Sequence, residues 1–240
     1  MMNQSIKPGE PRIIVALDFS NEATAMSLVE KLDPKLCRLK VGKELFTSSG
    51  PRLVEKLTSK GYEIFLDLKF HDIPNTVAKA CEAACKLGVW MLNVHASGGS
   101  QMMQAAREAV DKSDLHPYLI AVTVLTSMNE STLREIGIQT DLKSHVMHLA
   151  KLAERAALDG VVCSAEETMT LRKNLGSDFC LVTPGIRLIG ANSHDQSRVV
   201  TPRNAIELGS SYLVIGRPIT QSDDPIATLN QIHNELTMAK

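Results

Sequence analysis

The sequence predicts a single-domain (β/α)8 (TIM) barrel of the α/β class, and two observations carry this prediction. Short apolar and β-branched runs recur along the whole chain, and a longer segment with helical spacing follows each of them. This alternation is typical of parallel strands covered by helices. Eight such runs occur in 240 residues, which allows about 30 residues for each strand, helix and pair of loops. We therefore expect one domain over residues 1–240, with the barrel itself at about residues 12–235.

The eight predicted strands are short runs rich in valine, isoleucine and leucine, as buried strands usually are. They lie near Ile13–Leu17, Cys37–Val41, Ile64–Leu68, Met91–Val94, Leu119–Val124, Val161–Cys163, Leu181–Thr183 and Leu213–Ile215.

Helices are expected between these strands. Thr201 and Asp224 each precede a proline, and a capping side chain followed by proline favours the start of a helix. The stretch from Asn129 to Asp141 is a longer connection. Between the fifth and sixth strands, apolar residues three or four positions apart predict one buried helix face, formed by Leu142, Val146, Leu149, Ala153 and Ala157.

The composition narrows the possible partners and location. The chain has 26 lysines and arginines against 27 aspartates and glutamates, a formal net charge of -1, so it lacks the strong nonspecific attraction to nucleic acid or anionic membranes of a basic protein. Five cysteines without a Cys-x-x-Cys pair favour a reducing compartment. The first residues lack the apolar core of a signal peptide, and no apolar run approaches the roughly 18 residues of a membrane span. We expect a cytoplasmic protein with no nucleic-acid or membrane partner.

Charged side chains gather at the predicted carboxyl ends of the strands, where barrels of this kind carry their active sites. Asp18 follows the first strand, Lys40 lies in the second, and Asp67, Lys69 and Asp72 end the third. Asp67 and Lys69 are two residues apart and should point to the same side. An ammonium group between carboxylates should stay protonated at neutral pH and favour negative charge that develops beside it.

A purely structural interpretation remains open for these charges. Asp72 could stabilise the N-terminus of a helix that starts at Pro74, and Asp67 with Lys69 could form a structural ion pair. Burial of ions costs several kcal/mol each, however, and a second pair, Asp18 with Lys40, comes from neighbouring strands. We therefore favour a functional site. His95 either contacts this site or simply ends its strand.

The loops after the seventh and eighth strands are expected to bind phosphate, as they often do in such barrels. They carry Pro184, Gly185 and Arg187, then Gly216 and Arg217, and glycine with arginine suits phosphate oxygens; a turn with a solvated arginine is the alternative. Neither a Walker phosphate loop nor a dinucleotide fingerprint is present. His145 and His148 lack a third ligand and the His-Glu-x-x-His pattern, so no metal is expected.

Taken together, six blocks resemble the orotidine 5'-phosphate decarboxylase family over about residues 12–235. They are Val-Ala-Leu-Asp18, Leu-Lys40-Val-Gly, the run from Asp67 to Thr76, Val-Thr-Val-Leu-Thr126-Ser, Thr-Pro184-Gly-Ile-Arg187 and Val-Ile-Gly216-Arg217-Pro-Ile-Thr.

The resemblance implies decarboxylation of orotidine 5'-phosphate to uridine 5'-phosphate in de novo pyrimidine synthesis. Asp67 would lie against the substrate carboxylate, and Lys69 would protonate C6 as carbon dioxide leaves. Lys40 would complete an alternating charge network with Asp72. In this family the residues matching Asp72 and Ile73 come from the neighbouring subunit, which implies a homodimer with shared active sites.

The remaining implied roles concern substrate binding. Asp18 and Thr76 would bind ribose hydroxyls and Thr126 the pyrimidine edge, while the phosphate region would include Pro184, Arg187, Gln196, Gly216 and Arg217. A C6 carbanion lies in the ring plane and cannot delocalise into the π system, so fixed charge would take the place of a cofactor. We expect neither a metal nor an organic cofactor.

Two alternatives remain. A magnesium-dependent decarboxylase or aldolase of the same barrel group would act on an open-chain sugar phosphate through an enediolate. A noncatalytic barrel would bind a phosphorylated ligand and convert nothing.

Overall fold

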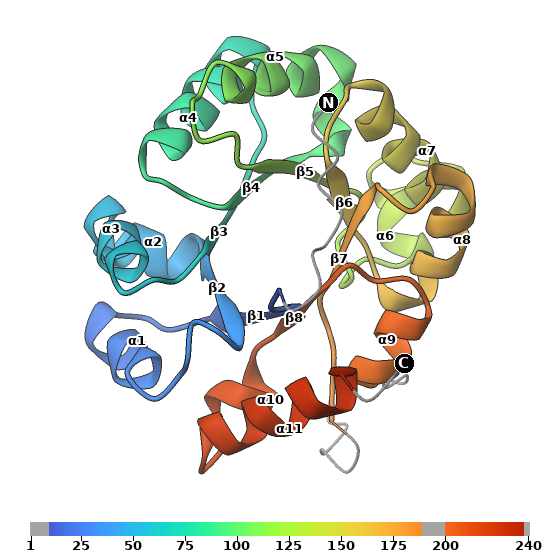
Figure 1. The fold of residues 1–240 in the computed structure, drawn as a ribbon. Coiled ribbons are helices and arrows are strands. Elements are labelled where there is room, and N and C mark those ends of the chain that lie inside the picture. Colours follow the sequence, from blue (N-terminus) through green and yellow to red (C-terminus); the bar gives the residue numbers. More distant parts are fainter. Residues whose placement is uncertain (1–9, 189–199, 238–240) are drawn as a thin grey trace.

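The computed structural model describes residues 10–188 and 200–237. Within them, eight parallel strands close into a barrel in chain order from β1 to β8 (Figure 1), so the predicted fold class is confirmed. The strands are β1 (Ile13–Leu17), β2 (Cys37–Gly42), β3 (Ile64–Phe70), β4 (Met91–His95), β5 (Tyr118–Val122), β6 (Gly160–Val162), β7 (Cys180–Thr183) and β8 (Tyr212–Ile215).

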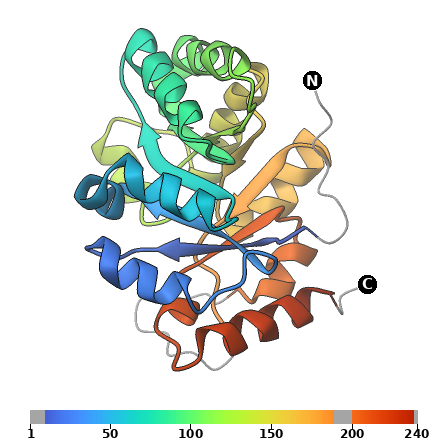
Figure 2. The same ribbon diagram turned by 60° about the vertical axis from the view of Figure 1, so that its left-hand side comes forward.

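Helices surround the barrel and cover the outer faces of its strands (Figures 1 and 2). In chain order they are α1 (Glu22–Val29), α2 (Lys43–Ser49), α3 (Pro51–Ser59), α4 (Pro74–Lys86), the 3-10 turn η1 (Ala96–Gly98), α5 (Gly99–Asp111), α6 (Glu130–Glu135), α7 (Leu142–Arg155), α8 (Ala165–Leu175), α9 (Pro202–Glu207), α10 (Arg217–Thr220) and α11 (Pro225–Thr237). None of those in the described part of the chain has the length and apolar character needed to cross a membrane.

The two expected caps are present. The Thr201 hydroxyl accepts a hydrogen bond from the backbone N–H of Asn204 at 3.2 Å, and the Asp224 carboxylate accepts one from Ala227 at 3.0 Å. The long connection after β5 contains α6, a helix that the sequence analysis did not predict. Its cap is Asn129, whose side-chain oxygen accepts from the backbone N–H of Thr132.

The predicted apolar face of α7 is confirmed for Val146, Leu149 and Ala153, which are buried. The assignment of Ala157 to this face is wrong. The helix ends at Arg155, and Ala157 is exposed with a left-handed backbone, φ 57°. The chain turns there to enter β6, so the helical spacing does not extend to this residue.

Alternate residues of each strand point into the barrel. Along the barrel axis, these inward side chains change from apolar to charged. The middle is filled by an apolar cluster of Ile14, Ala16, Phe65, Met91, Ile120, Cys180, Val182, Tyr212 and Val214. At the amino ends of the strands, the buried Arg38 guanidinium lies 4.2 Å from the Trp90 ring and 5.1 Å from the Tyr212 ring. Charged groups at the carboxyl ends occupy the opposite side of this apolar layer.

Candidate active site

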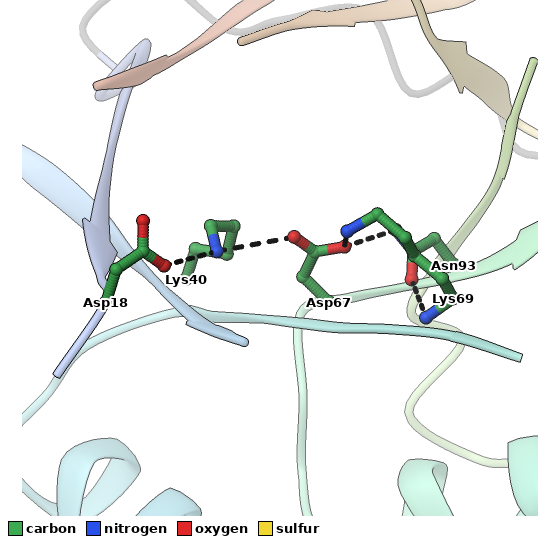
Figure 3. A network of polar contacts seen from close by, with 5 residues as sticks. All are labelled: Asp18, Lys40, Asp67, Lys69 and Asn93. Carbon is green, nitrogen blue, oxygen red and sulfur yellow. Dashed lines mark hydrogen bonds and ion pairs between the residues drawn. The ribbon is translucent and has the colours of Figure 1, made fainter. Parts of the chain in front are cut away.

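Four neighbouring strands bring five polar side chains together at the carboxyl end of the barrel (Figure 3). The Lys40 ammonium lies 3.0 Å from the Asp18 carboxylate and 3.3 Å from Oδ2 of Asp67. The Lys69 ammonium donates to Oδ1 of Asp67 at 2.6 Å. Acidic and basic groups therefore alternate from β1 to β3, and Asn93 on β4 donates to the same Asp67 oxygen at 2.7 Å.

The charges at the centre of this network are buried. Asp67 and Lys40 are each 8% exposed. Burial alone would raise the pKa of Asp67, but the charges of Lys40 and Lys69 and hydrogen bonds from Lys69 and Asn93 hold it below its usual value. Burial alone would lower the pKa of Lys40, but Asp67 and Asp18 together raise it. The structure therefore favours the ionised form of both groups.

Asp67 and Lys69 both lie within β3, which extends two residues beyond its predicted end at Leu68. Their side chains do meet, but regular strand alternation is not the reason. Lys69 has a left-handed backbone, φ 54°, and the pairing of β3 with β4 shifts register between Leu66 and Phe70. This irregular segment turns Lys69 toward Asp67.

A cavity of about 350 Å³ lies at the barrel mouth beside this network. Its lining contains most of the predicted site residues, namely Asp18, Lys40, Asp67, Lys69, Thr126, Pro184, Arg187, Gly216 and Arg217. Apolar side chains complete it, among them Phe65, Val122 and Val162. A larger groove between α4 and α5 has surface charges on its walls and none of the predicted residues. The mouth cavity, with fixed charges at one side and two arginines in its lining, is the candidate active site.

Three predicted residues do not line this cavity. Asp72, Ile73 and Thr76 are exposed at the start of α4, and Ile73 is 66% exposed. The expectation that two carboxylates flank Lys69 is not met within one chain, since Asp72 accepts from the Ile73 N–H at 2.7 Å instead. All three lie where the chain leaves β3 and enters α4, which begins at Pro74. Gln196 lies outside the described residues.

Asn93, which is fully buried beside the network, was not among the predicted site residues. The available signal was a polar residue in an apolar strand, two positions before His95 and thus on the same face. His95 itself lies near the site, with its ring 5.5 Å from that of His71. Burial lowers the pKa of His95 to about 4, and the neighbouring side chains of His71, Lys43 and Lys69 add to this effect.

Within residues 10–188 and 200–237, no group of three or more His, Cys, Asp or Glu side chains is arranged so that it could hold a metal ion. His145 and His148 stack with ring centroids 6.5 Å apart on α7.

Fold and site together define an α/β-barrel protein with a preassembled chain of buried acids and bases at the carboxyl ends of its strands. Its sequence matches the profile of the orotidine 5'-phosphate decarboxylase / HUMPS family over residues 11–232. The chain belongs to this family.

Relatives and a solved structure agree with that assignment. The orotidine 5'-phosphate decarboxylase of Hydrogenovibrio crunogenus is 59% identical over 232 residues, 97% of this chain and 98% of the relative. That of Saccharophagus degradans is 56% identical over 230 residues, 96% of this chain and 97% of the relative. The crystal structure of orotidine 5'-phosphate decarboxylase from Lactobacillus acidophilus superposes with a TM-score of 0.84 at 42% identity, covering 95% of this chain and 99% of that one.

His95 should make stability depend on pH. Its pKa of about 4 lies below the ordinary histidine value of 6.5, so the unfolded chain binds a proton more readily than the folded one between these values. Stability is then full above about pH 6.5 and falls as pH decreases toward 4. Between pH 7 and pH 4 we expect the wild type to lose about 1–2 kcal/mol more stability than the His95→Gln variant, which lacks the titrating ring. This difference is kept small because the ring is only half-buried. Urea unfolding at several pH values measures this, and parallel curves for the two proteins would contradict it.

Proposed function

We propose that this protein decarboxylates orotidine 5'-phosphate to uridine 5'-phosphate, a step of de novo pyrimidine synthesis. The observation that carries the proposal is the Lys69–Asp67 contact of 2.6 Å at the wall of the mouth cavity. Family membership supports it, since the curated relatives carry the name of this carboxy-lyase. The arrangement suits a substrate with a carboxylate at one end and a phosphate at the other.

The chemistry follows from the charges. When the substrate carboxylate lies beside Asp67, two negative groups repel each other, and loss of neutral carbon dioxide relieves the repulsion. The bond from C6 to the carboxyl carbon breaks, and its electron pair stays on C6 in the plane of the ring. Lys69 stabilises this charge and then transfers its proton to C6, giving uridine 5'-phosphate; water returns a proton to the amine. Lys40, held between Asp18 and Asp67, keeps Asp67 ionised.

An in-plane carbanion could not use the π-type electron sink of an organic cofactor, and in this proposal the fixed charge of Lys69 takes the place of a metal. We therefore propose a cofactor-independent reaction. Fixed charge, exclusion of water and binding energy from the phosphate supply the rate enhancement.

Substrate binding is assigned to the rest of the lining. Arg187, Gly216 and Arg217 bind the phosphate, with Pro184 shaping their loop. Thr126 contacts the pyrimidine edge, and Asp18 a ribose hydroxyl. Gln196 stays a prediction for the phosphate region.

We further propose a homodimer in which Asp72 and Ile73 of each subunit complete the other's site, with Thr76 at a ribose hydroxyl. Support comes from their exposure, since both Asp72 and the apolar Ile73 lie outside the cavity of their own chain. A cytoplasmic location fits five free, buried cysteines, and the net charge of -1 gives no reason to expect a nucleic-acid partner.

The proposed activity is tested by following the ultraviolet absorbance of orotidine 5'-phosphate after exhaustive treatment of the protein with a chelator. We expect full turnover to uridine 5'-phosphate and carbon dioxide. Activity that returns only with magnesium would favour the enediolate alternative. Binding of uridine 5'-phosphate without turnover would favour the noncatalytic barrel.

Lys69→Ala and Arg217→Ala should affect different steps. Loss of the Lys69 proton donor is expected to reduce kcat at least about 1000-fold. Loss of Arg217 removes charged hydrogen bonds to phosphate and should weaken binding of uridine 5'-phosphate about 10- to 100-fold. Steady-state kinetics and calorimetric titration measure the two effects. Near wild-type turnover without Lys69, or unchanged affinity without Arg217, would contradict the role assigned to that residue.

Mixing two inactive variants tests the shared site. A dimer of one Lys69→Ala and one Asp72→Ala subunit has one site with both residues intact and one site with neither. Random exchange of subunits should therefore restore about a quarter of wild-type activity. Differently tagged subunits allow the mixed dimers to be isolated, and these should show about half of wild-type activity because one of their two sites is intact. Inactive mixed dimers would disprove sharing.

A further inference from the structure

Asn93 forms a bridge between the backbone of Lys69 and the side chain of Asp67. It lies in the middle of β4, is 0% exposed and pairs with Ile120 on β5. Its side-chain oxygen accepts from the Lys69 backbone N–H at 2.8 Å, and its side-chain nitrogen donates to Oδ1 of Asp67 at 2.7 Å (Figure 3). One amide thus contacts both residues of the central ion pair.

The irregular segment of β3 explains why such a bridge is needed. Leu66 pairs with Leu92 and Phe70 with Val94, so three residues of β3 lie opposite the single residue Asn93. Lys69 is one of these three, and its φ of 54° is unfavourable for a residue with a side chain. Regular pairing with β4 does not fix this backbone. The Lys69 N–H is instead bonded to the Asn93 side-chain oxygen.

An amide meets both requirements at this position and carries no charge at any pH. The Lys69 N–H needs an acceptor, and the Asp67 carboxylate needs a donor. A leucine would leave both groups without this partner in a buried place, and an ionised aspartate would place negative charge against Asp67.

The same contact fixes the direction of the Lys69 ammonium. Asn93 and the ammonium donate to one oxygen of Asp67, Oδ1, while Lys40 contacts the other, Oδ2. The carboxylate is therefore held against rotation, and the ammonium that binds it is held with it.

We propose that Asn93 is a positioning residue, which sets the place of the Lys69 ammonium in the mouth cavity by bracing both the Lys69 backbone and the Asp67 carboxylate. For the reaction affected, the inference rests on the proposed function. Asn93 itself lies behind the ion pair and is not part of the cavity lining.

The first test is Asn93→Ala, assayed beside the wild type. We expect kcat on orotidine 5'-phosphate to fall at least about 100-fold, because a displaced donor loses the aligned geometry of proton transfer. Affinity for uridine 5'-phosphate should change less than about 3-fold, since the phosphate and base contacts remain. The matched control is Thr168→Val, which removes a fully buried hydroxyl that bonds Ala165 O within α8. This control should keep wild-type kcat.

The second variant, Asn93→Asp, gives a pH signature that a general loss of stability would not produce. Position 93 faces Asp67 and Lys69 from β3, with Lys40 of β2 behind Asp67, His95 further along β4 and the apolar Ile120 on β5. A protonated aspartic acid there can accept from the Lys69 N–H and donate to Asp67, as the amide does. The kcat of this variant relative to wild type should therefore rise at least about 10-fold from pH 8 to pH 5.5.

The outcomes separate the two proposals. If the wild type does not convert orotidine 5'-phosphate, the proposed function fails, and crystal structures of wild type and Asn93→Ala then decide the inference by the position of the Lys69 ammonium. An unmoved ammonium, or wild-type kcat in an active Asn93→Ala protein, would overturn it. If Asn93→Ala does not fold, a flat pH dependence of the kcat ratio for Asn93→Asp would overturn it instead.

Discussion

The site depends on the burial of the Asp67 carboxylate between two ammonium groups. An isolated carboxylate in this position would take up a proton and become neutral, because removal of an ion from water costs several kcal/mol. Lys40 and Lys69 prevent this, and each is satisfied by the same carboxylate. The strand ends hold these groups before any ligand arrives, so little reorganisation is needed when charge develops at a reacting atom.

The barrel makes this arrangement possible by separating tasks along its axis. The middle layer is apolar and supplies the burial that stabilises the fold, while the layer above it contains the charges. Arg38 at the opposite end shows a different solution for a buried cation. Its guanidinium lies over an aromatic ring and pairs with Glu63 at 2.7 Å, so its charge is satisfied by protein groups alone.

The sequence predicted the eight strands to within two residues at each end, because buried parallel strands and their capped helices leave periodic, local signals. It also predicted the residues that gather at the mouth, since strand order alone brings carboxyl ends together. The direction of Asp72 and the place of Asn93 were beyond it. The first depends on how α4 leaves β3, which has no local pattern. For the second, a polar residue in an apolar strand was a local signal, but its contacts depend on an irregular pairing of two strands. The single-domain extent over residues 1–240 stays a prediction.

The interrupted pairing beside Lys69 also separates the site from the scaffold. Because three residues of β3 lie opposite one residue of β4 there, the backbone N–H of Lys69 bonds to the Asn93 side chain rather than to the ladder that closes the barrel. If Asn93 positions the ammonium as proposed, substitutions at this point of β4 would change the reach and direction of the ammonium, while the regular pairs on either side still join β3 to β4. Such a fold can adapt its chemistry by small steps while the architecture that supports it stays constant.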